Sequence, residues 1–233
     1  MALGRDLAVA DARWSASRAH GTLTGPLLED PLELALALPG RHQFDNAALA
    51  VMAYVAFSEW WLPMTGHALA AVEDVVHSLA TVDWPLRAEI VQEAPLLLVD
   101  AAHNPSGMAA LAAMLGEHGR GWQVMLAVRK DRDAAELIRT LAPWTACFWL
   151  ARCQGETLRP ADELAVLVDR VAPACLVAVG SPQRCLTQAL READRGPGVV
   201  VTGSQHALGE WLQAGVLRSP RLERRLSRHH HVP

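Results

Sequence analysis

Short apolar segments alternate with segments of helical length from residue 89 to residue 214, and this alternation restricts the possible folds. The expected strands lie at residues 89–91, 96–99, 124–128, 147–150, 175–179 and 199–201. The expected helices lie at residues 105–117, 133–141, 160–171, 182–193 and 205–214. Strands and helices that alternate in this way form a mostly parallel sheet with helices on both faces. We therefore predict an α/β domain with a Rossmann-like sheet, whose first two strands form a hairpin because only residues 93–95 separate them.

The segment L-L-L-V-D-A-A-H-N-P, residues 96–105, contains the most informative passage from a strand to a helix. Its apolar run is typical of a buried parallel strand. Asn104 is a suitable N-cap, and Pro105 is a suitable first residue, for the helix that follows. Asp100 and His103 are therefore expected at the carboxyl end of a strand, facing a helix N-terminus. Open α/β sheets bind ligands at this edge, and helix N-termini favour anions there.

The composition argues against several classes of protein. The formal net charge is −4 at pH 7, whereas nucleic-acid-binding surfaces carry clustered basic residues, so we expect no nucleic-acid partner. The four cysteines show no Cys-x-x-Cys pair and no metal-ligand spacing, which favours reduced thiols and no metal site. Asp6 and Asp11 interrupt any signal peptide, and no apolar run approaches the roughly 20 residues of a membrane span. We expect a cytoplasmic protein without a membrane partner.

The sequence pattern changes near residues 82–85, which we predict to separate two parts of the chain. Within the first part, residues 1–82, the expected elements are an extended segment at 32–38 and helices at 44–60 and 66–79. Two helices and one or two strands are too few for a self-contained domain, so this part is expected to belong to a larger unit. Residues 83–217 contain the predicted sheet, and residues 218–233 form a basic tail that we expect to be disordered.

Glycine-rich phosphate loops of two common kinds do not occur in the sequence. There is no G-x-x-x-x-G-K-[ST], and no G-x-G-x-x-G stands between a strand and a helix. The glycines within residues 116–121 follow an expected helix and precede a strand, which is the wrong order for a dinucleotide-binding turn. A nicotinamide-dependent oxidoreductase is therefore the least favoured alternative.

Three longer motifs and several short ones follow one another along the chain. The longer motifs are G-R-H-Q-F-D-N-A-A-L-A at residues 40–50, W-P-L-R-A-E at 84–89 and D-A-A-H-N-P at 100–105. The short motifs are G-R-D-L at residues 4–7, D-R-D at 131–133 and G-S at 203–204. In type, order and spacing, these motifs resemble those of the folylpolyglutamate synthase/dihydrofolate synthase family, part of the Mur ligase superfamily. The resemblance implies the end of a central ATPase domain in residues 1–82, followed by a Mur ligase C-terminal domain.

This resemblance implies an ATP-dependent amide ligation, in which ATP phosphorylates a folate-type carboxylate and glutamate attacks the acyl phosphate. Asn46, Arg87 and Asp100 match positions that contact ATP in the family, whose reaction also uses Mg²⁺. His103 and Ser204 match positions near the incoming glutamate, and His103 and Asp100 are the implied catalytic residues. The chemistry agrees, because arginine presents a charged, forked donor to phosphate and a helix N-terminus favours a carboxylate.

The front half of the family's pattern has no counterpart in these 233 residues. The family's phosphate loop, Mg²⁺ ligands and carbamylated lysine precede the matched region, and Lys130 is the only lysine present. Leu86 and Arg132 also replace a glycine and a lysine of the motifs. We expect the isolated chain to be inactive and to need a separate N-terminal half. The alternatives are a non-catalytic nucleotide- or amino-acid-binding module and another Mur-type ligase.

Overall fold

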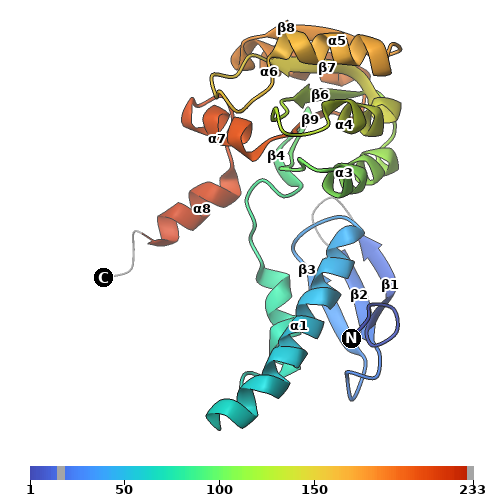
Figure 1. Cartoon of the computed structure of the whole chain (residues 1–233), viewed down its shortest axis with the longest axis vertical. Coiled ribbons are helices and arrows are strands. Elements are labelled where there is room, and N and C mark those ends of the chain that lie inside the picture. Colours follow the sequence, from blue (N-terminus) through green and yellow to red (C-terminus); the bar gives the residue numbers. More distant parts are fainter. Residues whose placement is uncertain (15–18, 230–233) are drawn as a thin grey trace. The chain divides into compact units, whose positions relative to one another are not determined.

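The computed structural model describes residues 1–14 and 19–229, and the chain divides into two compact units (Figure 1). The first unit is Met1–Trp84 and the second is Pro85–Pro233. The boundary lies two residues beyond the predicted one, immediately before the proline of the W-P-L-R-A-E motif. Each unit has its own buried apolar core, so each is described by itself.

The first unit packs two helices against a small antiparallel sheet. Its strands are β1 (Ala8–Trp14), β2 (Ala19–Thr24) and β3 (Leu32–Leu36), in the order β1-β2-β3. Its helices are α1 (His42–Thr65) and α2 (Val72–Ser78), followed by a short 3-10 turn, Leu79–Thr81. The prediction of one or two strands was too low, because β1 and β2 consist largely of small and polar residues and lack an apolar run. Their pairing with β3 and α1, rather than their own hydrophobicity, forms this sheet.

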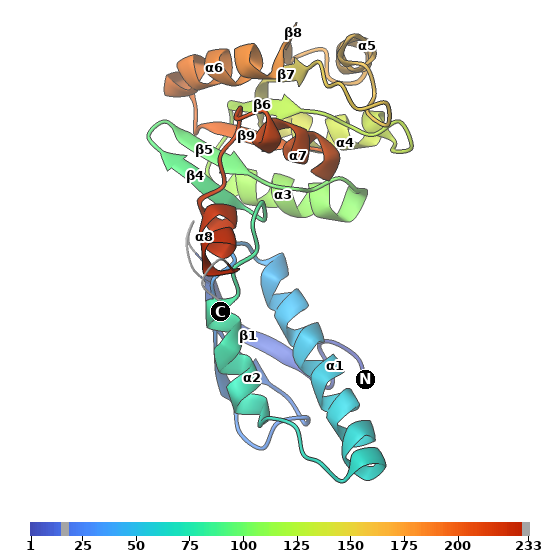
Figure 2. The ribbon, with the colours of Figure 1, turned by 90° about the vertical axis from the view of Figure 1, so that its left-hand side faces the viewer.

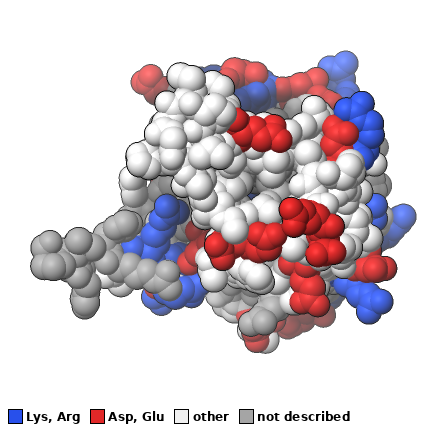
Figure 3. All heavy atoms as spheres, turned by 90° about the horizontal axis from the view of Figure 1, so that it is seen from below, with Lys and Arg blue, Asp and Glu red and all other residues white. Residues whose placement is uncertain are grey.

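Helix α1 buries only its N-terminal half. Figure 1 and Figure 2 show it alongside the small sheet, and Phe44, Ala48 and Val51 are its buried contacts there. The C-terminal half exposes large apolar side chains, including Trp60 and Met64, which are 57% and 67% exposed. Figure 3 shows one face of the molecule with a broad uncharged area beside acidic side chains. The exposed half of α1 therefore offers an apolar surface that this unit leaves uncovered.

By length and composition alone, α1 is the one helix in the described chain that could cross a membrane. It has 24 residues, and its apolar window has a mean hydropathy of 1.3. Ser58 and Glu59 interrupt its apolar residues, so it reaches membrane-spanning length as a helix and not as one unbroken apolar run. Part of this helix is a core helix packed on β1–β3, and such helices pass the same test.

The second unit is built on a six-stranded sheet, which confirms the predicted α/β fold. Its strands, in sheet order, are β4 (Glu89–Glu93), β5 (Leu96–Val99), β9 (Val199–Thr202), β6 (Trp122–Leu126), β7 (Thr145–Ala151) and β8 (Leu176–Gly180). Only β4 runs antiparallel to its neighbour, and it forms the predicted hairpin with β5 at the edge of the sheet (Figure 2). The remaining neighbours pair in parallel.

Helices cover both faces of this sheet. They are α3 (Pro105–Glu117), α4 (Ala134–Leu141), α5 (Ala161–Val171), α6 (Pro182–Glu192) and α7 (Gln205–Gln213). Helices α3, α4 and α5 share one core with Leu98 and Val200, whereas α6 and α7 share the opposite core with Val99 and Val201. Successive strand residues alternate between the two cores, as the pleat of a buried strand requires.

The basic tail is not disordered over most of its length, which corrects the prediction for residues 218–233. Helix α8 (Pro220–His229) follows β9 and α7, and residues 230–233 lie outside the described part of the chain. Ser219 caps the helix by accepting a hydrogen bond from Leu222 N at 3.0 Å. Its hydroxyl also donates to the buried carboxylate of Glu89 at 2.7 Å. The partner of the cap is thus 130 residues away in sequence, where no local pattern could reveal it.

The four cysteines are free thiols, and burial raises the pKa of each above its ordinary value. Burial raises the pKa of Cys147 and of Cys153 from an ordinary value of 9.0 to about 12. Because the folded state prefers the protonated thiols, this stabilisation is complete below pH 9.0 and is lost as pH rises toward 12.

We expect the free energy of unfolding to fall by about 1 kcal/mol per pH unit for each of these thiols between about pH 9 and about pH 11. Urea unfolding over this range measures the slope. The double variant Cys147→Ala, Cys153→Ala is expected to lose that part of the slope. Equal slopes for the two proteins would contradict the prediction.

Candidate functional site

The carboxyl ends of three neighbouring strands meet at one edge of the larger sheet. Strand β9 lies between β5 and β6, and its register pairs Val99 with Val201 and Leu126 with Thr202. Helix α3 follows β5 on one face, while α7 follows β9 on the other. The connections of two adjacent strands therefore diverge, which is the topological switch point where α/β sheets bind ligands.

Asp100 is buried immediately after β5 and organises the backbone at this edge. Its Oδ2 accepts a hydrogen bond from Ala88 N, and its Oδ1 accepts one from Ala102 N, both at 2.8 Å. Ala101 N also donates to Leu86 O at 2.8 Å. Asp100 thus ties the loop that carries Arg87 to the end of β5. This positioning role is visible in the geometry, whereas the sequence motif indicates only a ligand contact.

His103 lies three residues further on, and one hydrogen bond sets its tautomer. Its Nδ1 is 2.9 Å from Ala101 O. A carbonyl oxygen only accepts hydrogen bonds, so Nδ1 carries the proton in this contact. In the neutral ring, Nε2 is then the atom with the lone pair. His103 is half-buried and can therefore accept a proton or an N–H hydrogen bond from a ligand at the sheet edge.

Ser204 is fully buried at the N-terminus of α7, where its hydroxyl accepts from Ala207 N at 3.5 Å. Gly203 precedes it with φ +106°, and its N–H donates to Ala102 O at 3.0 Å. A Cβ at Gly203 would lie only 2.3 Å from Ala127 O. The G-S motif is therefore a glycine-dependent turn that brings Ser204 beside the Asp100–His103 loop.

Arg87 lies in an exposed loop with an unusual backbone. Leu86 and Ala88, on either side of it, adopt φ values of +60° and +43°. The glycine that the resembled motif has at position 86 would suit this conformation, and here a leucine adopts it. Among residues 1–14 and 19–229, no group forms a hydrogen bond or ion pair with the Arg87 side chain. Its guanidinium is exposed beside the Asp100 loop.

Two residues at the same edge were missed by sequence reasoning. Arg129, three residues beyond β6, forms a two-pronged ion pair with Asp131, at 2.9 and 3.0 Å. Its third nitrogen lies 3.1 Å from His206 Nε2 on α7. The Arg129 guanidinium holds the pKa of the Asp131 carboxyl below its ordinary value. Arg129 lies outside the D-R-D motif. It links Asp131 of that motif to His206 at the N-terminus of α7.

Asn46, the fifth predicted residue, belongs to the first unit. It is exposed on the second turn of α1, and its Nδ2 donates to Oε1 of the buried Gln43 at 3.1 Å. The helix N-cap is Arg41, so Asn46 does not cap the helix. Gln43 orients the Asn46 amide, a role that the motif alone did not reveal. The structure thus brings together Arg87, Asp100, His103 and Ser204 within the second unit, and Asn46 is described apart from them.

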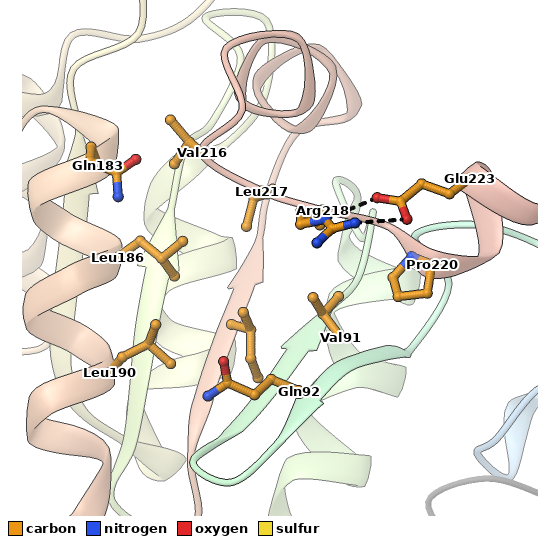
Figure 4. Close-up of a pocket in the computed structure, with 11 residues that line it drawn as sticks. Val91, Gln92, Gln183, Leu186, Leu190, Val216, Leu217, Arg218, Pro220 and Glu223 are labelled. Carbon is orange, nitrogen blue, oxygen red and sulfur yellow. Dashed lines mark hydrogen bonds and ion pairs between the residues drawn. The ribbon is translucent and has the colours of Figure 1, made fainter.

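A separate hollow of about 510 Å³ lies away from these residues (Figure 4). It is lined by one face of α6, by the β4–β5 hairpin and by the segment entering α8. Leu186 and Leu190 form its apolar wall, and an ion pair between Arg218 and Glu223 closes one side at 3.1 Å. None of the five predicted site residues lines it. In the described part of the chain, no group of three or more His, Cys, Asp or Glu side chains could hold a metal ion.

The fold and this sheet edge define a class of protein, and comparison with known families agrees. Residues 86–205 match the family model described as "Mur ligase, glutamate ligase domain". This match covers more than half of the chain, so the chain belongs to the Mur ligase family.

Within that family, the relatives of this chain are folylpolyglutamate and dihydrofolate synthases. It is 26% identical over 214 residues to a probable bifunctional folylpolyglutamate synthase/dihydropteroate synthase of Halobacterium salinarum, covering 89% of this chain and 24% of that protein. It is 34% identical over 115 residues to the dihydrofolate synthase/folylpolyglutamate synthase of Mycobacterium tuberculosis, covering 48% of this chain and 22% of that protein.

A solved structure matches both units of the chain. The Mycobacterium tuberculosis folylpolyglutamate synthase complexed with ADP has a TM-score of 0.77 and 24% sequence identity to it. That match covers 93% of this chain and 49% of the other, so the likeness shows the fold over half of a larger structure. The chain spans about a quarter of the length of the curated relatives that it matches.

Proposed function

We propose that this chain is the C-terminal part of an ATP-dependent ligase that joins glutamate to a folate-type carboxylate. The observation that carries the proposal is the sheet edge. There, the Asp100 carboxylate and backbone hydrogen bonds connect the Arg87 loop, the Asp100–His103 segment and the Gly203–Ser204 turn. The names of the relatives support the substrate class, and the ADP complex of one of them supports a nucleotide ligand. We further propose that the protein works in the cytoplasm, as folate synthesis from soluble substrates requires no membrane.

Each residue at the edge has a chemical role in this proposal. Arg87 offers a permanently charged, forked donor to phosphate oxygens, and the Asp100 carboxylate can accept ribose hydroxyls. The amino group of glutamate must lose a proton when it attacks the acyl phosphate, and Nε2 of His103 is the acceptor available at this edge. The N-terminus of α7 at Ser204 favours a glutamate carboxylate. For Asn46 we keep the nucleotide contact that the motif at residues 40–50 implies.

We propose that the phosphate loop comes from residues outside these 233, on the same polypeptide or on another. Mg²⁺ binds carboxylate and phosphate oxygens, and the described residues form no cluster of acidic ligands for it. The exposed half of α1, with Phe57, Trp60 and Met64, is an apolar surface that such residues could cover. They would supply the phosphate loop and the Mg²⁺ ligands.

Steady-state kinetics test this proposal. The chain alone is expected to show no glutamate- and folate-dependent formation of ADP above buffer. Co-expression with the N-terminal half of a related folylpolyglutamate synthase is expected to restore it, and His103→Ala is expected to lower the restored kcat by about 100-fold or more.

Turnover by the chain alone would contradict the predicted need for a partner. Binding of ADP or glutamate without turnover in the combined protein would instead favour a non-catalytic binding module. A matched control is His118→Ala, because His118 lies at the far end of α3 and its Nδ1 contacts Met114 O. That variant is expected to keep the restored kcat.

A further inference from the structure

Glu89, the last residue of the W-P-L-R-A-E motif, is a buried acid with a role that the motif does not suggest. It is 1% exposed, and its carboxylate accepts three hydrogen bonds. Leu86 N donates to Oε2 at 2.9 Å, Ser219 Oγ donates to Oε2 at 2.7 Å, and Arg221 N donates to Oε1 at 2.8 Å. A buried carboxylate is stable only when its oxygens are satisfied in this way. Glu89 therefore connects the Arg87 loop directly to the start of α8.

Helix α8 also contacts the loop through a side chain. Arg221 Nη1 donates to the carbonyl oxygen of Arg87 at 3.3 Å. Ser219 is buried and caps α8, so the helix start is a fixed part of the second unit. We call Glu89, Ser219 and Arg221 the Glu89 anchor. It contacts Leu86 and Arg87 of the loop, whereas the Asp100 carboxylate accepts a hydrogen bond from Ala88 N.

The loop needs both sets of contacts because its backbone is strained. Leu86 and Ala88 have φ values of +60° and +43°, which L-residues rarely adopt. Conformations of this kind persist only when surrounding contacts determine them. The exposed Arg87 guanidinium has no partner of its own among the described residues, so its direction depends on the backbone that carries it.

We propose that the Glu89 anchor positions Arg87 for its ligand, so that the C-terminal helix is a working part of the nucleotide site. Glu89 is a positioning residue that acts through Arg87, and loss of the anchor lets the loop relax away from the strained conformation. This inference rests on the proposed nucleotide role of Arg87. It adds that α8, which lies outside the family-matched residues 86–205, determines how well that role is performed.

Nuclear magnetic resonance on the full chain tests the anchor in two ways. In Glu89→Gln, the amide hydrogens of Leu86, Ala88 and Ala101 are expected to exchange at least about tenfold faster than in the unmodified chain. The matched control is Glu93→Gln on the same strand, because Glu93 is exposed, and it should leave these rates unchanged. Ser219→Ala is the milder second variant if Glu89→Gln does not fold.

The second readout is ADP affinity in a double-mutant cycle. Arg87→Ala and Glu89→Gln are each expected to weaken ADP binding about tenfold, and the double variant is expected to bind no more weakly than Arg87→Ala alone. If Glu89 had a purely structural role, the two losses of ADP affinity would multiply in the double variant. That result would overturn the proposed positioning role of the Glu89 anchor. Unchanged exchange rates of the loop amides would overturn it as well. If ADP fails to bind the unmodified chain while the exchange rates respond, the proposed function is overturned instead.

Discussion

Replacing Gly203 with alanine is expected to destabilise the second unit strongly, although the variant should remain folded without denaturant. Gly203 has φ +106°, and a Cβ there would lie 2.3 Å from Ala127 O and 2.6 Å from a methyl of Leu126. Ala127 directly follows β6, and its N–H donates to Thr202 O of β9 at 3.3 Å, so a shift of this backbone would disturb the β6–β9 pairing. The strain of the left-handed conformation and the steric overlap together should cost about 4 kcal/mol of unfolding free energy.

Urea unfolding measures this effect, and helix α7, which follows the Gly203–Ser204 turn, provides a matched control. Gly209 lies inside α7, and a Cβ there would meet nothing within 4 Å. Gly209→Ala is therefore expected to stabilise the protein by about 0.5 to 1 kcal/mol. A Gly203→Ala protein that unfolds within about 1 kcal/mol of the unmodified chain would contradict the geometry of the Gly203–Ser204 turn.

Replacing Asp100 with alanine is expected to destabilise the protein by about 3 kcal/mol. The change leaves the buried amides of Ala88 and Ala102 without the carboxylate that accepts both of their hydrogen bonds. Each unsatisfied buried donor costs about 1 to 3 kcal/mol. Urea unfolding measures the loss, and hydrogen exchange should show the Ala88 and Ala102 amides becoming less protected.

Asp162→Ala provides the comparison for Asp100. Asp162 forms an exposed ion pair with Arg152 at 3.1 Å, and such pairs contribute about 1 kcal/mol or less. If Asp100→Ala destabilised the protein no more than Asp162→Ala does, Asp100 would not organise the sheet edge. Its role would then be limited to contact with a ligand.

The parts of the fold that were predicted from sequence are those with local signals. Helix α3 begins at Pro105 as predicted, because Asn104 accepts from Gly107 N at 2.8 Å. Helix α4 starts after Asp133, and α7 starts after Ser204, each capped by its own side chain. All six strands of the larger sheet were predicted. For the central strands the signal is an apolar run, because a parallel strand buried on both faces needs no polar alternation.

The parts that were missed depend on partners far away in sequence. Strands β1 and β2 carry few large apolar residues and are completed by β3 and α1. Helix α8 is fixed by Glu89, which accepts a hydrogen bond from the capping residue Ser219, 130 residues further along the chain. At the site, the motifs supplied the residues near the ligand edge, but not the Glu89 anchor or the contact between Arg129 and His206. Such contacts are visible only once the topology brings the segments together.

The most direct test of a ligand site at this sheet edge is a titration of ADP and then glutamate into the isotopically labelled chain, with amide chemical shifts recorded for every residue. We expect ADP to shift the amides of Leu86 to Ala88 and Asp100 to Asn104, and glutamate to shift those of Gly203 to Ala207. Arg87→Ala should weaken the response to ADP without changing the response to glutamate. Shifts confined to the hollow lined by Leu186 and Leu190, or no shifts at all, would contradict a ligand site at this edge of the sheet.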